Sequence, residues 1–146
     1  MHTLDDIDRQ IINALSRNSR IPLKRLSEQV HLSAPAVSAR IEHLEEEGYI
    51  CGYSTILNYE KLGQPITAFI ELTVEPDMRA SFNTFVNSKS CVLECYHVAG
   101  VYSMLLKVCF PTPSKLYEFI GILQSFGKTE TQIVFSCVVP PRNMKL

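Results

Sequence analysis

The chain has 146 residues, of which 46% are hydrophobic and 20% charged, and its 14 basic and 15 acidic side chains give a formal net charge of −1. This length accommodates one domain or two small ones, and the absence of any run of about 18 apolar residues excludes a membrane span. A near-neutral chain has no overall attraction for nucleic acid, so a nucleic-acid-binding surface has to arise from local clustering of charge.

The cysteine content bears on the cellular compartment. Five cysteines are an odd number without the spacing of a disulfide framework, which predicts reduced thiols and a cytoplasmic protein. Cys51, Cys109 and Cys137 stand in apolar, strand-like segments and are expected in the core. The N-terminal stretch MHTLDDIDRQ is acidic and amphipathic, unlike a signal peptide.

Residues 1–50 are predicted to form three short helices. Apolar residues repeat at helical spacing over 7–15, behind a start that resembles a capping box. Pro22 suits the first turn of a second helix, and Ser33 suits the cap of a third helix that stops before Gly48. Three short helices, the last two joined by a tight turn, are typical of a helix-turn-helix domain.

The middle of the chain is predicted to be a wing and a linker. Residues 49–57 are apolar and β-prone, which indicates a strand that forms the wing. Residues 58–64 contain a glycine and read as a boundary. We therefore expect a DNA-binding domain over 1–50, a wing strand and linker over 51–64, and a second domain over 65–146.

The second domain is predicted to be an α+β sandwich. Alternation of period two over 66–75 indicates a strand, and helical spacing of apolar residues marks two helices. The order strand-helix-strand-strand-helix-strand is that of a ferredoxin-like βαββαβ unit. The remaining expected strands are 91–98, 103–110 and 129–139, the expected helices are 78–87 and 113–126, and the final stretch PPRNMKL is expected to fray.

The third helix has two different ends. With Val37, Ile41 and Leu44 turned inward, the N-terminal half of its outer face is small and nearly uncharged, whereas its other end carries glutamates. Small side chains let a helix approach the floor of a DNA major groove, and the helix dipole favours phosphate there. Since phosphate repels glutamate, this helix is predicted to enter DNA by its N-terminus. Its outer face consists of Pro35, Ala36, Ser38, Ala39, Glu42, His43 and Glu46.

Basic residues cluster locally although residues 1–60 as a whole are net acidic. Arg20, Lys24 and Arg25 are assigned to DNA phosphates. Arg40 is assigned to a phosphate or a guanine, with a structural pairing to glutamate left open, and an ordinary solvated bundle is the alternative for the whole region. With few polar side chains to read bases, sequence preference is expected to come largely from DNA bendability. The predicted DNA-binding residues are Arg20, Lys24, Arg25, Ser33, Ala34, Pro35, Ala36, Ser38, Ala39, Arg40 and His43.

Three stretches, LDDIDRQIINAL, SRIPLKRLSEQVHLSAPAVSARIEHLEEEGYI and KTETQIVFSCVV, resemble the Lrp/AsnC (feast/famine) transcriptional regulators. The resemblance spans about residues 4–139. It implies a winged helix-turn-helix followed by a ligand-sensing domain, binding of double-stranded DNA, a homodimer formed through the C-terminal sheet, and further assembly, often to an octamer. It also implies an amino acid or related small-molecule effector bound near the turn between the second and third strands, and no enzymatic activity.

That turn reads VAGVYSMLLKV here. Many relatives carry acidic residues after the glycine, but this sequence has Val101 and Ser103 at those places, so the carboxylates that would meet an effector's ammonium group are missing. A different ligand, or none, is expected, and a plain hairpin that needs Gly100 for its backbone angles is the alternative. The candidate effector-binding residues are Ala99, Gly100, Val101, Tyr102, Ser103 and Thr131.

Other chemistry has weaker support. Cys91, Cys95 and His97 share a strand face, but their spacing matches no standard zinc pattern, so no metal site is expected. No glycine-rich phosphate loop or nucleophile elbow occurs, so no cofactor is expected. Two further readings stay open: a haem-precursor decarboxylase that uses His97, and a DNA-organising protein without an effector.

Overall fold

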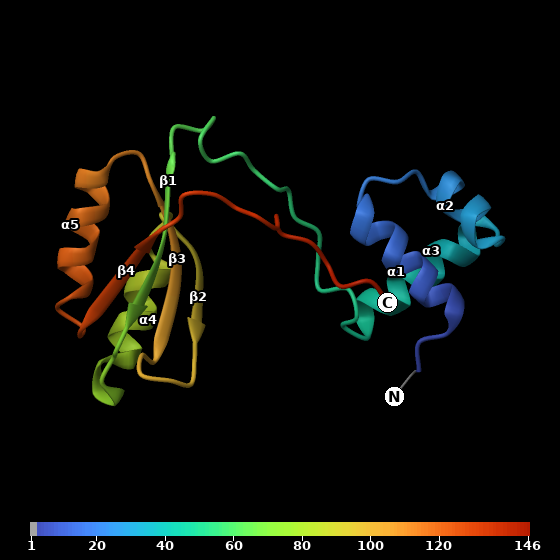
Figure 1. The fold of residues 1–146 in the computed structure, drawn as a ribbon. Coiled ribbons are helices and arrows are strands. Elements are labelled where there is room, and N and C mark those ends of the chain that lie inside the picture. Colours follow the sequence, from blue (N-terminus) through green and yellow to red (C-terminus); the bar gives the residue numbers. More distant parts are fainter. Residues whose placement is uncertain (1–2) are drawn as a thin grey trace. The chain divides into compact units, whose positions relative to one another are not determined.

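The computed structural model describes residues 3–146, which divide into two compact units. One unit runs to Ile56 and also includes Val139–Leu146, and the other comprises Leu57–Val138. The first unit holds the helices α1, α2 and α3, and the second holds a four-stranded sheet with the helices α4 (Arg79–Asn87) and α5 (Pro113–Leu123) (Figure 1). Within the described residues, no helix has the length and apolar character that crossing a bilayer requires.

The first unit confirms the predicted three helices, α1 (Asp6–Arg17), α2 (Leu23–Val30) and α3 (Ala34–Glu46). The capping-box-like start Thr3-Leu4-Asp5-Asp6 lies at the beginning of α1 as predicted, but the box itself is formed by Asp5 and Asp8. One face of each helix supplies the core, because apolar residues recur there every three or four positions. The buried apolar residues of this core are Ile11, Ala14, Leu26, Val30, Val37 and Leu44.

The turn between α2 and α3 depends on His31, whose φ of 55° is left-handed. A left-handed residue ends a helix and redirects the chain, and its backbone N–H here donates to the carbonyl of Ser27. Ser33 then caps α3 by accepting a hydrogen bond from the Ala36 N–H at 3.4 Å. The tight α2–α3 turn of a helix-turn-helix is thereby formed.

The wing strand predicted over 49–57 is not formed in this chain. Residues 51–58 are exposed and have no strand assignment. Their apolar side chains remain largely open to solvent, among them Tyr53 (51% exposed) and Ile56 (76% exposed). Because β-propensity reflects packing against a neighbouring strand, a β-prone stretch without such a neighbour stays irregular.

The second unit confirms the ferredoxin-like α+β topology, with helices packed on the sheet. Its strands are antiparallel in the order β2-β3-β1-β4. The core lies between the helices and the sheet face that carries Ala68, Ile70, Leu106 and Val108. The elements are β1 (Ile66–Leu72), the short η1 (Pro76–Met78), α4 (Arg79–Asn87), β2 (Val92–His97), β3 (Met104–Phe110), α5 (Pro113–Leu123) and β4 (Thr129–Ile133).

The last strand is shorter than predicted, since β4 ends at Ile133 and not at residue 139. The Val134 N–H still donates to the carbonyl of Thr67, and beyond it the chain leaves the sheet. Before β4, Gly127 lies so close to β1 that a Cβ there would overlap the carbonyl oxygen of Thr73. The stretch PPRNMKL, residues 140–146, is predicted to fray at the end of the second domain, but Val139–Leu146 instead belongs to the helical unit.

Candidate DNA-binding surface and effector turn

The N-terminal half of α3 presents a small, nearly uncharged surface. Pro35 and Ala39 are exposed, and Ala36 and Ser38 are half-buried. Ser38 donates its hydroxyl to a carboxylate oxygen of Glu42 at 3.3 Å, one turn further along the helix. This surface therefore offers a backbone that a groove floor can approach closely, with one hydroxyl at its centre.

The other end of α3 is acidic and exposed. Glu45, Glu46 and Glu47 all face solvent, and Glu45 accepts a hydrogen bond from the Tyr53 hydroxyl at 2.7 Å. A carboxylate held by the chain that follows the helix cannot approach DNA phosphate without repulsion. The helix thus has one end suited to DNA and one end suited to solvent.

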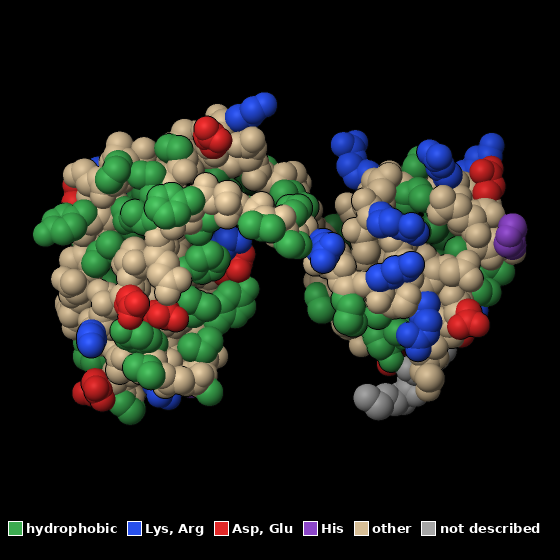
Figure 2. Space-filling view, in the orientation of Figure 1, with side chains coloured by type: hydrophobic (Ala, Val, Ile, Leu, Met, Phe, Trp, Pro, Cys, Tyr) green, Lys and Arg blue, Asp and Glu red, His purple; other side chains and the backbone are tan. Residues whose placement is uncertain are grey.

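Three of the predicted phosphate contacts, Arg20, Lys24 and Arg25, are exposed. Arg20 and Lys24 lie on either side of the start of α2, and no ion pair engages these three cations within residues 3–146. Figure 2 shows Lys and Arg side chains gathered over the visible face of the helical unit. Exposed cations without carboxylate partners are available to bind an anionic polymer.

Arg40 is not available in the same way. Its Nη1 donates to Asp5 at 2.7 Å and to Asp8 at 2.6 Å, so a single nitrogen links α3 to the capping box of α1. The Asp8 side chain is only 3% exposed. The backbone N–H of Asp8 and the guanidinium of Arg40 together hold the pKa of Asp5 below its usual value. The structural pairing left open for Arg40 is therefore what the fold shows, with aspartates in place of glutamate.

Sequence reasoning missed Asp5 and Asp8 as partners of Arg40. The predicted capping pattern covers residues 3–6 and does not include Asp8, and nothing local to Arg40 indicates contacts with residues 35 and 32 positions away. This ion pair changes the role expected of Arg40. Because its guanidinium neutralises a buried carboxylate, Arg40 contributes to the folded structure of the helical unit and is not free to bind DNA in the way that Arg20 is.

The turn between β2 and β3 is tied to the end of β1. Ser103 accepts a hydrogen bond from the Val74 N–H at 3.0 Å through its hydroxyl, and its own N–H donates to the carbonyl of Leu72 at 3.1 Å. Gly100 has a φ of 157°, which L-residues rarely adopt. These contacts are those of a hairpin anchored in the sheet, and they engage one of the predicted effector residues.

The other effector candidates differ in how available they are. Val101 is 88% exposed and Ala99 is also exposed, whereas Tyr102 donates its hydroxyl to Glu130 on β4 at 2.8 Å. Thr131 is half-buried on β4 and pairs with Ile70. The Tyr102–Glu130 bond brings the turn beside β4, so a carboxylate does stand near this turn, supplied from a strand that the sequence pattern did not point to.

The remaining cysteine and histidine candidates are separate side chains on the surface or the sheet. Cys109 is buried as predicted, but Cys51 and Cys137 are exposed, because residues 51–58 and 134–139 lie outside any strand. Cys95 and His97 are exposed on β2. In the described part of the chain, no three histidine, cysteine, aspartate or glutamate side chains converge to hold a metal ion.

The chain joins a helix-turn-helix unit to an antiparallel α+β unit. The helix-turn-helix unit exposes three cations, Arg20, Lys24 and Arg25, that make no ion pair among the described residues. This combination defines the class of DNA-binding regulators that carry a second domain. A winged helix-turn-helix DNA-binding model matches residues 4–50, and an Lrp/AsnC ligand binding domain model matches residues 67–144. The chain belongs to the Lrp/AsnC family of DNA-binding transcriptional regulators.

Individual relatives agree with this assignment. The chain is 37% identical to YezC, an uncharacterized HTH-type transcriptional regulator of Bacillus subtilis, over 91% of this chain and 94% of the relative. The structure of Bacillus subtilis LrpC matches with a TM-score of 0.90 at 28% identity, covering 96% of this chain and all of LrpC. A feast or famine regulatory protein from M. tuberculosis complexed with L-methionine matches with a TM-score of 0.89 at 28% identity. The match covers 99% of this chain and 100% of that protein.

Proposed function

We propose that this regulator reads DNA with the N-terminal half of α3, while Arg20, Lys24 and Arg25 bind the flanking phosphates. The observation that carries the proposal is the asymmetry of α3: small exposed residues at Pro35 and Ala39, and exposed glutamates at the opposite end. Because the small face supplies few hydrogen-bonding groups, DNA bendability contributes much of the sequence preference.

The protein acts as a homodimer that assembles further, up to an octamer, in this proposal. The sheet face opposite α4 and α5 carries Phe69 and Leu105, which are half-buried, and Cys109, which is buried. Lys107 and Glu94 form an ion pair of 2.9 Å on the same face. A second copy laid on this face would cover the apolar residues, and pairing two reading helices would double the DNA contacts across a symmetric site. As a regulator of DNA, the protein works in the cytoplasm.

An amino acid or a related small molecule is the proposed effector, bound beside the turn at residues 98–103. The match to a ligand binding domain and the methionine complex of a relative support this part. The proposed partner of an ammonium group is Glu130, which accepts a hydrogen bond from Tyr102 of the turn, because Val101 and Ser103 supply no carboxylate.

The DNA part is tested by placing a carboxylate on the small face. Ala39→Glu, at an exposed position, is expected to lower affinity for the protein's own upstream DNA by about 100-fold, because juxtaposed like charges cost several kcal/mol. Glu46→Gln, at the acidic end, serves as the matched control and is expected to change affinity less than about twofold. Fluorescence anisotropy measures both. Equal affinities for Ala39→Glu and the wild type would exclude the small face from the interface.

A further inference from the structure

The segment Val139–Leu146 packs on the helical unit at α1. The Asn13 side-chain amide donates to the carbonyl of Leu146 at 2.9 Å, and the Leu146 N–H donates back to the Asn13 side-chain oxygen at 3.0 Å. This reciprocal pair holds the segment against α1. The segment carries two further cations, Arg142 and Lys145, into the unit that binds DNA.

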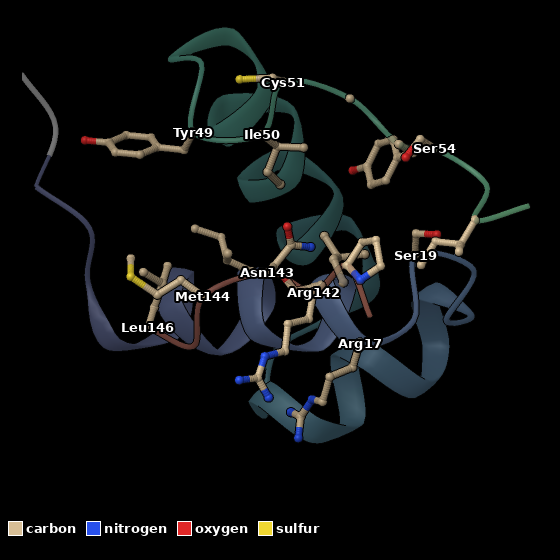
Figure 3. Close-up of a pocket in the computed structure, with 17 residues that line it drawn as sticks. Arg17, Ser19, Tyr49, Ile50, Cys51, Ser54, Arg142, Asn143, Met144 and Leu146 are labelled. Carbon is tan, nitrogen blue, oxygen red and sulfur yellow. The ribbon is translucent and has the colours of Figure 1, made fainter. Parts of the chain in front are cut away.

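A cavity of about 630 Å³ lies where this segment meets the rest of the unit. Arg17, at the end of α1, and Arg142 both line it, and Figure 3 shows their guanidinium groups pointing in the same direction. Three serines, two tyrosines and Asn143 add neutral polar groups, and no Asp or Glu among residues 3–146 lines this cavity. The charged side chains of this lining are therefore all positive, and its neutral polar groups are able to donate hydrogen bonds.

The two arginines are not neutralised by the chain. Arg17 donates through Nε to the carbonyl of Asn13 at 3.1 Å, which orients the side chain and leaves its terminal nitrogens for another acceptor. Within residues 3–146, neither arginine makes an ion pair. Two guanidinium groups brought to one cavity repel each other unless an anion lies between them, and planar guanidinium forks suit phosphate oxygens.

The position of Arg17 and Arg142 within the helical unit indicates that the phosphate they bind belongs to the DNA backbone. Arg17 precedes Arg20 by three residues, and a short exposed loop joins α1 to the start of α2, where Lys24 and Arg25 lie. The two arginines thus extend the basic surface of the helical unit. We propose that Arg17 and Arg142 together bind a phosphate of the DNA backbone, so that a segment from beyond the sheet domain forms part of the DNA-binding surface. This inference rests on the proposed DNA-binding function.

The test compares full-length Arg142→Gln with the wild type in DNA-binding anisotropy across a salt series. Removing one phosphate contact lowers the slope of log affinity against log salt by about 0.9. Lys115→Gln is the matched control, because Lys115 is an exposed cation on α5 in the other unit and forms an ion pair with Glu118 of the same helix. Arg142→Gln is expected to show the reduced slope, and Lys115→Gln is expected to keep the wild-type slope.

A second variant tests how the segment is held. Asn13→Ala removes both hydrogen bonds to Leu146 and leaves Arg142 in place. Like Arg142→Gln, it is expected to reduce the slope of log affinity against log salt, because an arginine on an untethered segment contributes less to binding. An unchanged slope in Arg142→Gln, with normal wild-type binding, would overturn this inference and leave the proposed function intact. Absence of DNA binding by the wild type would overturn both.

Inorganic phosphate distinguishes a small anion from the DNA backbone. Thermal unfolding of the wild type and Arg142→Gln is compared in phosphate and in chloride at equal ionic strength. If phosphate stabilises only the wild type while the DNA salt slopes of the two proteins coincide, the site takes a free phosphate-bearing molecule and the DNA assignment is wrong. A reduced DNA slope in Arg142→Gln supports the assignment whatever the response to phosphate.

Discussion

The surface of the helical unit and the turn at residues 98–103 were both predicted as recognition sites, yet the fold uses their residues differently. Arg20, Lys24 and Arg25 are exposed cations without carboxylate partners among the described residues. In the turn, Ser103 and Tyr102 already hold hydrogen bonds to β1 and β4. A residue of the right type in the right place is available for binding only when the fold has not already engaged it.

Arg40 is the helical unit's own example of an engaged residue, and it is expected to give the largest effect on stability. Arg40→Ala removes the guanidinium that is bonded to the buried carboxylate of Asp8, which is expected to lower the free energy of unfolding by about 2–3 kcal/mol. Arg20→Ala removes an equal charge from an exposed position and is expected to stay within about 0.5 kcal/mol of the wild type. Hydrogen exchange of the α1 and α3 amides, with urea unfolding, measures both. Equal stabilities would show that Arg40 is free to serve DNA.

Ser103 tests whether the turn at residues 98–103 is engaged by the fold. Ser103→Ala removes the acceptor of the buried Val74 N–H and is expected to lower the free energy of unfolding of the α+β unit by about 1 kcal/mol. Ser90, which is exposed, provides the control through Ser90→Ala. Urea unfolding gives the stabilities, and DNA affinity is expected to be unaltered. A Ser103→Ala variant as stable as Ser90→Ala would mean that the hydroxyl is not needed by the fold and is available to an effector.

Arg25 is expected to affect binding and leave stability unchanged. One phosphate contact makes the affinity for DNA fall by an additional factor of roughly three when salt rises from about 50 to 200 mM. Arg25→Ala should therefore narrow the ratio of the affinities at these two salt concentrations by roughly threefold. Anisotropy on the same duplex measures the ratio, and the Lys115→Gln protein is again the control. A ratio equal to that of the wild type would remove Arg25 from the phosphate contacts.

Val101 is expected to show the smallest change in stability. Val101→Asp places a carboxylate at an 88% exposed position and should alter the free energy of unfolding by less than about 0.5 kcal/mol. The new carboxylate is expected to raise the affinity for L-methionine, measured by titration calorimetry, because it adds a partner for the ammonium group. Val101→Asn, of similar size and without charge, is the control. Equal affinities of the two variants for L-methionine would show that the ammonium group of the ligand does not lie beside residue 101.

The fold was largely predictable from local patterns. The helical repeats, the cap at Ser33 and the alternation over 66–75 depend on near neighbours in sequence, and the structure confirms the three helices and the βαββαβ order. The wing strand at 49–57 and the extension of β4 to residue 139 were wrong. Both stretches are β-prone, but a strand needs a partner, and partners are set by tertiary structure.

The sites were less predictable than the fold. The small and acidic ends of α3 follow from helical geometry, so the sequence indicates them directly. The contact between Arg40 and Asp8 spans 32 positions, and the contact between Asn13 and Leu146 spans 133. Neighbouring residues in the sequence do not indicate such contacts, so the sequence pattern favours a DNA contact for Arg40, with a structural pairing as the alternative, and predicts no role for Arg142.

Anisotropy on two duplexes of equal length, the protein's own upstream DNA and a scrambled version, tests the central claim most directly when it is run across a salt series. The account predicts strong preference for the upstream DNA, with affinity that falls steeply as salt rises. Equal, salt-sensitive binding to both duplexes would favour a DNA-organising protein over a site-specific regulator. No binding to either duplex at low salt would contradict the assignment of α3 as the reading helix.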